Sequence, residues 1–149
     1  METILKNLKI AIFDVMEKMF FLLPDESDGS IPEISDSESV YIGITGKPAY
    51  VVSLEFDHTL AATMSSDLLG LDAEDVDTET IQKCLKETAN IIAGNFLLGF
   101  DNEENRNVTL PHMQKNEVMG SYNALSDNEF TLSYNGCGIN ILLEAVESE

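Results

Sequence analysis

The segment that decides the fold spans residues 78–98 and has the sequence TETIQKCLKETANIIAGNFLL. An α-helix turns by about 100° per residue, which places the apolar residues of this segment on one side. Taking Ile81 as the reference, the residues within about 80° of it are Cys84, Leu85, Thr88, Ala89, Ile92 and Phe96. The pattern predicts a long amphipathic helix with this side buried and with Asp77 or Thr78 as its N-cap.

The opposite side of this helix is mostly polar and holds Lys83, Lys86, Glu87, Asn90 and Gly94, together with Leu97. Glu87 and Asn90 are three residues apart, so their side chains are neighbours on one surface. A solvated helix face would explain that pair without any function. However, Asn is a mediocre helix former, and Gly costs about 1 kcal/mol relative to Ala inside a helix. A neutral amide beside bare backbone lets another protein approach closely, and an amide can hold a water molecule as donor and acceptor at once.

The segments on either side alternate between helical and strand patterns. Before residue 78 we expect a helix over residues 2–23 ended by Pro24, an acidic mobile loop over 25–38, a hairpin over 39–56, and a short helix over 58–69 stopped at Gly70. After residue 98 we expect an edge strand over 107–113 interrupted by Pro111, an ambiguous segment over 118–125, and a hairpin over 130–146 turning at Asn135-Gly136. This order predicts an α+β fold, a mostly antiparallel sheet with long helices packed against it, in a single domain over residues 1–149.

The charge of the chain excludes several classes of partner. Eight Lys and Arg residues face 27 Asp and Glu residues, which gives a formal net charge of −19. Nucleic-acid binding needs a basic surface, and anionic membranes attract basic segments, so we expect neither partner. The longest purely apolar run, Met19–Leu23, is far shorter than the roughly 20 residues of a membrane span. Cys84 and Cys137 form no metal-binding spacing and suit two small buried side chains in a reducing cytoplasm.

Other common chemistries lack their motifs. The chain has no GxSxG sequence, no phosphate-binding glycine loop and only two histidines, His58 and His112. Its acidic residues show no metal-ligand spacing, and the Asp25–Gly29 stretch has its glycine one place too early for a calcium-binding EF-hand loop. We therefore expect no metal site and no cofactor held by this chain itself.

The stretch from Glu87 to Asn95 resembles the signature helix of the CheX branch of the CheC, CheX and FliY chemotaxis phosphatases. That family has a Glu-x-x-Asn motif followed about twenty residues later by a proline, and here Asn90 and Pro111 are 21 residues apart. The opening helix, from Ile10 to Met19, also resembles that of CheX. The resemblance implies a CheC-like fold and hydrolysis of the aspartyl phosphate of a CheY-like response regulator.

The resemblance also implies a role for each residue. Asn90 would orient the attacking water, and Glu87 would pair with the active-site lysine of the phosphorylated receiver, which would itself carry the Mg²⁺. Gly94 would allow close approach, while Lys83, Lys86 and Pro111 would flank the docking surface. Family members are typically homodimers joined through their sheets, so we expect a homodimer.

Two other interpretations remain open. Family members often have Asp or Ser four residues before the glutamate, where this chain has Lys83. The departure leaves room for a non-catalytic CheX-like module that sequesters or scaffolds a phosphorylated receiver. A ligand-binding sensor domain unrelated to chemotaxis is the third interpretation.

Overall fold

The computed structural model describes residues 2–26, 32–34, 36–100, 105–114 and 128–146. Within them the elements follow the order α1 (Glu2–Phe20), β1 (Ser37–Ile44), β2 (Ala49–Asp57), α2 (His58–Leu69), the 3-10 turn η1 (Ala73–Asp75), α3 (Thr78–Leu97), β3 (His112–Gln114), β4 (Glu129–Tyr134) and β5 (Cys137–Val146). The predicted order of helices and strands is confirmed. The ambiguous segment 118–125 lies outside the described residues.

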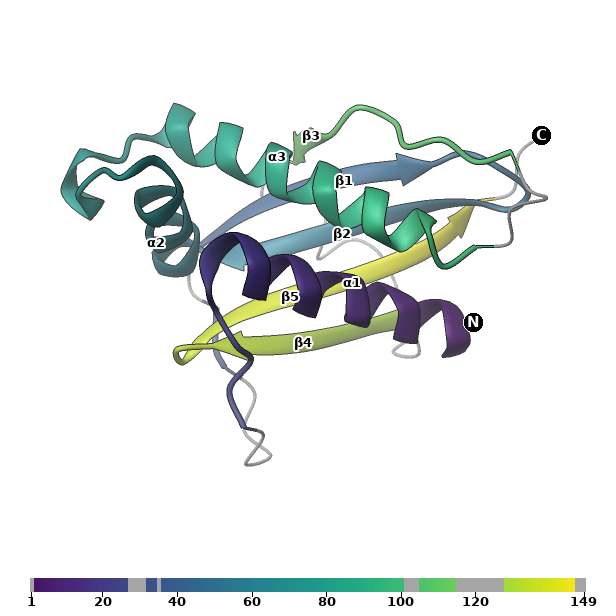
Figure 1. Cartoon of the computed structure of the whole chain (residues 1–149), viewed down its shortest axis with the longest axis horizontal. Helices are drawn as coiled ribbons and strands as arrows, with labels where there is room; N and C mark the ends of the chain where they lie inside the picture. Colours follow the sequence, from purple (N-terminus) through teal and green to yellow (C-terminus); the bar gives the residue numbers. More distant parts are fainter. Residues whose placement is uncertain (1, 27–31, 35, 101–104, 115–127, 147–149) are drawn as a thin grey trace.

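The strands form one antiparallel sheet covered on one face by helices. In the described part of the chain the sheet has five strands in the order β3-β1-β2-β5-β4, and every pair of neighbours is antiparallel. Helices α1 and α3 lie side by side across the same face of this sheet, and α2 lies at one end of the layer (Figure 1). The predicted α+β fold is therefore confirmed.

The core lies between the sheet and the two long helices. Alternate residues of β1 and β2, from Val40 to Ile44 and from Tyr50 to Phe56, are buried, as the period of two in a strand requires. They meet the apolar side of α3, where Ile81, Ile92 and Phe96 are at most 2% exposed. Burial of one large aliphatic side chain contributes about 1.5–3 kcal/mol, so this layer fixes the orientation of α3.

Helix α1 ends earlier than its sequence pattern predicts. The predicted end at Leu23 is wrong, because Phe21 adopts a left-handed conformation with φ 56°. The amide of Phe21 donates to the carbonyl of Glu17, and the amide of Leu22 donates to that of Met16, a closing pattern usually built on glycine. As a result Leu23, predicted to be the last residue of the helix, lies outside it and is 65% exposed.

The turn between β4 and β5 is held by Asp25, a residue far from it in the sequence. Its carboxylate accepts hydrogen bonds from the Ser133 hydroxyl at 2.7 Å and from the amides of Asn135 and Gly136 at 3.0 and 2.8 Å. Asn135 and Gly136 both have positive φ, as the predicted Asn-Gly turn requires. The loop over residues 25–38, expected to be mobile, is therefore anchored at its first residue, Asp25.

Candidate functional site

Helix α3 presents the polar side on which the candidate residues lie. It begins where predicted, because the Asp77 carboxylate accepts a hydrogen bond from the amide of Thr80 at 2.8 Å. The Thr80 hydroxyl, followed by this bond from the Thr80 amide, holds the pKa of Asp77 below its usual value. On the opposite side Thr88 is fully buried, and its hydroxyl donates to the carbonyl of Cys84 at 2.7 Å. The Asp77 cap therefore sets where α3 begins, and its buried apolar side determines which side meets solvent.

Glu87 and Asn90 both lie on this exposed side, as predicted. Neither side chain makes a hydrogen bond or an ion pair with another residue of the described ranges. Their Cβ atoms are about 5–6 Å apart at three-residue spacing in a helix. The structure therefore presents a carboxylate and an amide side by side, with their polar atoms available to another molecule.

The residues predicted to flank this pair also lie on or beside α3. Lys83 and Lys86 are exposed, and the Lys83 ammonium lies 3.2 Å from the carboxylate of Glu79, one turn earlier. Gly94 follows one turn after Asn90, and a Cβ added to it would meet nothing described within 4 Å except its chain neighbours and the adjacent backbone of α3. Pro111 directly precedes β3, which pairs with β1 and contacts α3.

Arg106, which the sequence pattern does not indicate, fixes the segment that leads to Pro111. Its guanidinium lies 4.6 Å from the ring centroid of Phe100 and 5.3 Å from that of Tyr50. It also donates to the carbonyl of Pro48 at 2.6 Å. Arg106 is the only arginine in the sequence and is 9% exposed. Arginine is rare in this acidic chain, so Arg106 stands out in the sequence. Its contacts with Pro48 and Tyr50 could not be predicted, because Pro48 is 58 residues earlier and Tyr50 lies close to Pro48 in the chain.

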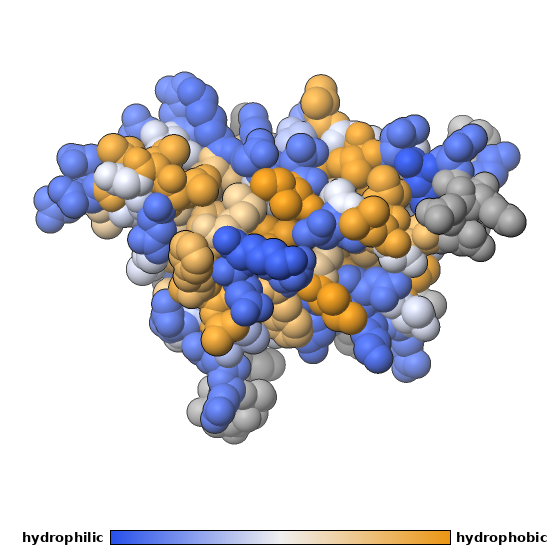
Figure 2. Space-filling model, viewed as in Figure 1, coloured by the Kyte–Doolittle hydropathy of each residue, from blue (hydrophilic) through white to orange (hydrophobic). Residues whose placement is uncertain are grey.

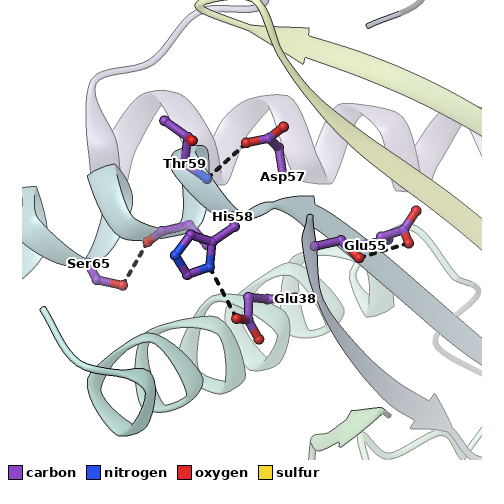
Figure 3. Close-up of polar contacts among 8 residues, drawn as sticks. Glu38, Glu55, Asp57, His58, Thr59 and Ser65 are labelled. Carbon is purple, nitrogen blue, oxygen red and sulfur yellow. Dashed lines mark hydrogen bonds and ion pairs between the residues drawn. The ribbon is translucent and has the colours of Figure 1, made fainter. Parts of the chain in front are cut away.

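The histidines and cysteines do not form a second catalytic site among the described residues. His58, the first residue of α2, places Nδ1 3.2 Å from the Glu38 carboxylate, and the nearby Ser65 hydroxyl donates to the carbonyl of Ala61 within α2 (Figure 3). His112 stacks on Tyr41. Burial raises the pKa of the Cys84 and Cys137 thiols, which favours the unreactive protonated form.

No group of three or more His, Cys, Asp or Glu side chains in the described ranges could hold a metal ion. None of the helices described has the length and apolar character needed to cross a membrane.

The charge of the chain is distributed unevenly between the helical layer and the rest. Helices α1 and α3 are each formally neutral, because the acidic and basic residues in them balance: Glu2, Asp14 and Glu17 against Lys6, Lys9 and Lys18, and Glu79 and Glu87 against Lys83 and Lys86. The net charge of −19 is therefore carried by the residues outside these two helices. The two long helices that form the layer around Glu87 and Asn90 are therefore less acidic than the net charge of the chain indicates.

Comparison with known protein families gives a match over more than half of the chain. The family described as chemotaxis phosphatase CheX matches residues 39–134, which include Glu87, Asn90 and Pro111. The chain belongs to the CheX family. The resemblance of the Glu87–Asn95 stretch to CheX is thereby confirmed. No curated protein sequence matches the chain.

Solved CheX structures have the same fold. A CheX–CheY–BeF3–Mg²⁺ complex from Borrelia burgdorferi matches with a TM-score of 0.70 and 22% identity over 95% of this chain and 97% of the other. CheX from Desulfovibrio desulfuricans matches with a TM-score of 0.67 and 16% identity over 95% and 98% of the two chains. CheX from Vibrio vulnificus matches with a TM-score of 0.65 and 18% identity over 95% and 96%.

Proposed function

We propose that this CheX-family protein hydrolyses the aspartyl phosphate of a CheY-like response regulator. The observation that carries the proposal is the pair Glu87 and Asn90 on the exposed side of α3, with neither side chain engaged by the described residues. The helix beneath them is fixed by its buried face, so the pair is held in position before the partner arrives. The Borrelia complex of CheX with CheY supports a receiver of this type as the partner.

In this proposal Asn90 positions the attacking water. An acyl phosphate is already activated, and its hydrolysis mainly lacks an aligned nucleophile. The amide oxygen of Asn90 accepts a hydrogen bond from the water while the amide nitrogen donates to the phosphoryl group or to the water oxygen. The transfer itself requires little covalent chemistry from the protein, so one well-placed amide can suffice. The Mg²⁺ that neutralises the phosphoryl oxygens belongs to the receiver.

Glu87 orients the complex in this proposal. Its carboxylate pairs with a lysine of the receiver's active site and so sets the angle at which α3 enters. Gly94 lets the receiver approach the backbone of α3, and Lys83, Lys86 and Pro111 contact the receiver at the edges of the pair. An ion pair that becomes buried on docking is screened less by salt than one left at the rim.

Lys83 supports one alternative function. A lysine where family members often have Asp or Ser changes the charge next to the pair, which would suit a module that binds a phosphorylated receiver without hydrolysing it. Both functions share one docking surface, and they differ only in whether the bound receiver loses its phosphoryl group faster.

We also propose that residues 1–149 form a single domain, that the protein acts in the cytoplasm, and that two copies associate through their sheets. The position of β4 at one edge of the described sheet supports the last point, because an unpaired edge can add strands from another chain. Light scattering at several concentrations tests the dimer.

The experiment that tests the catalytic proposal measures phosphate loss from a panel of phosphorylated receivers, with and without the protein. We expect at least one receiver to be dephosphorylated faster. Asn90→Ala should remove the acceleration, whereas Asp67→Asn, an exposed change on α2, should leave it unchanged. Binding of a receiver without faster phosphate loss would instead establish the non-catalytic module.

A further inference from the structure

A groove lies between the middle of α1 and the C-terminal end of α3. These two helices lie side by side on one face of the sheet (Figure 1). It has a volume of about 200 Å³, and its lining includes Asn7, Ile10 and Asp14 from α1 and Asn95, Leu98 and Gly99 from α3 and the residues after it. Small-molecule pockets usually measure roughly 300–1,000 Å³. The groove is therefore better suited to one side chain of a protein partner than to a free ligand.

Two large aliphatic side chains at this groove are unusually exposed. Leu98 is 82% exposed and Ile10 is 54% exposed. On the same face of the molecule, apolar residues gather over α3 and α1 among hydrophilic ones (Figure 2). Exposed aliphatic residues scattered singly need no explanation, but two beside one groove mark a place where a partner can bury them.

The groove continues the surface that holds Glu87 and Asn90. At about 100° per residue, Glu87, Gly94 and Leu98 are displaced from Asn90 by about 60°, 40° and 80°, all in the same direction around the helix. That direction leads toward α1, because Asn95, at about 140° in the same sense, lines the groove with α1 residues. The side of α3 that carries the Glu87 carboxylate and Gly94, which has no side chain, is thus the side that borders the groove.

The size of an ordinary interface places the groove inside the docking footprint. Leu98 is eight residues after Asn90, or about 12 Å along the helix axis. A stable protein interface covers about 800 Å² on each partner, a patch roughly 30 Å across. A receiver centred on Asn90 therefore covers Leu98, and the two helices that border the groove are formally neutral, so the acidic character of the rest of the chain does not oppose that contact.

We infer that this groove receives an exposed aliphatic or aromatic side chain of the receiver and that Ile10 and Leu98 select the receivers that carry one. The inference rests on the proposed function. An apolar anchor fits because the aliphatic side chains of Ile10 and Leu98 line the groove, while the carboxylate in its lining, Asp14, is already paired with Lys18 at 3.0 Å. Ile10 and Leu98 lie away from the reacting atoms, so they act on binding and leave the chemical step to Asn90.

The test compares kcat and KM for a receiver that the wild-type protein dephosphorylates. Leu98→Ser and Ile10→Ser should each raise KM for the phosphorylated receiver, by about tenfold where the side chain is fully buried on docking, with kcat unchanged. Leu69→Ser is the matched control, because Leu69 is 52% exposed at the end of α2, away from the groove, and it should leave both constants unchanged. Asn90→Ala should have the opposite effect on the two constants, with a loss of kcat and little change in KM.

The outcomes separate this inference from the function on which it rests. An unchanged KM in both serine variants, beside an inactive Asn90→Ala variant, overturns the groove and leaves the phosphatase intact. If a receiver binds but is not dephosphorylated, the phosphatase proposal fails, and the dissociation constants of the same serine variants decide the groove. A wild-type protein that neither binds nor dephosphorylates any receiver overturns both. A fall in kcat with unchanged KM in Leu98→Ser would also contradict a binding role.

Discussion

Gly94 is half-buried one turn after Asn90 on α3, and a Cβ at residue 94 would meet nothing described within 4 Å except its chain neighbours and the adjacent backbone of its own helix. Packing among the described residues therefore gives no reason for a glycine there. Gly in a helix is less favourable than Ala by about 1 kcal/mol. Under the proposed function, a receiver that approaches the backbone of α3 provides a reason.

Gly94→Ala should therefore stabilise the protein and weaken its function. We expect a gain of about 0.5–1 kcal/mol, which for a chain of this size raises the thermal midpoint by roughly 1–4 °C. Calorimetry measures the midpoint, and receiver titration should show weaker binding. A stabilised variant that binds its receiver as tightly as the wild type would show that the docked surfaces do not meet at Gly94.

Asn90→Ala and Glu87→Gln should affect different steps. Asn90→Ala removes the water-positioning amide and should abolish accelerated dephosphorylation, while replacement of an exposed helical Asn by Ala raises stability by a few tenths of a kcal/mol. Glu87→Gln should mainly raise KM, because it weakens a charge pair with the receiver. Asn90→Gln keeps the amide but displaces it by one methylene, so it should recover little activity. Wild-type activity in Asn90→Ala would refute the mechanism even within this family.

Asp25 predicts a pH-dependent part of the stability. Its hydrogen bond from Ser133, followed by that from the Gly136 amide, lowers the pKa of the Asp25 carboxyl in the folded protein. A lowered folded-state pKa contributes stability above the unfolded pKa, near 4, and that contribution fades as the pH falls through the folded value. Asp25→Asn should thus destabilise the protein by about 1 kcal/mol near neutral pH.

Urea unfolding of wild type and Asp25→Asn between pH 7 and pH 3 measures this difference. The gap in unfolding free energy should be constant from pH 7 to about pH 5 and should shrink below about pH 4. Glu26→Gln, at the neighbouring exposed carboxylate, is the matched control and should show little gap at any pH. A gap that widens as the pH falls would contradict the role given to Asp25.

Arg106→Lys should be markedly destabilising despite keeping the charge. A lysine cannot stack a planar group on Phe100 and Tyr50 while it donates to the carbonyl of Pro48. We expect a loss of about 2 kcal/mol of stability, which urea unfolding measures. Lys47→Ala, an exposed change in the turn that Arg106 holds, should cost much less.

The sequence predicts those features that depend on local periodicity. The buried side of α3, its Asp77 cap, the Gly70 stop of α2 and the Asn135-Gly136 turn are all confirmed, because each is decided by residues within a few positions of one another. Exposure of Glu87 and Asn90 follows from the same periodicity. The local sequence pattern is therefore sufficient to predict the exposure of Glu87 and Asn90, on which the proposed function depends.

Features created by the approach of distant segments could not be predicted. The left-handed Phe21 ends α1 although Phe rarely takes that conformation. Asp25 meets a turn more than 100 residues later, and the groove beside Leu98 exists only because α1 packs along α3. The neutrality of the helical layer is visible in the sequence only after the structure shows that α1 and α3 form one surface.

The charge distribution gives the last prediction, on how this acidic protein meets an acidic receiver. At long range the partner is repelled by the net charge of −19, whereas near contact it faces a formally neutral layer with Lys83 and Lys86 beside the pair. Salt screens exposed charges beyond about 10 Å at 0.1 M, so it should remove the long-range repulsion more than the contact pairs. The association rate should therefore rise from low to moderate salt, the reverse of attractive steering.

Lys83→Glu and Lys86→Glu should each slow association and steepen its salt dependence. Lys47→Glu adds the same charge at the β1–β2 turn, away from α3, and should have a smaller effect. Stopped-flow rates across a salt series measure all four proteins. A rate that falls as salt is added would mean that attraction by the lysines near the pair outweighs the net charge, and equal slowing by all three variants would mean that only total charge matters.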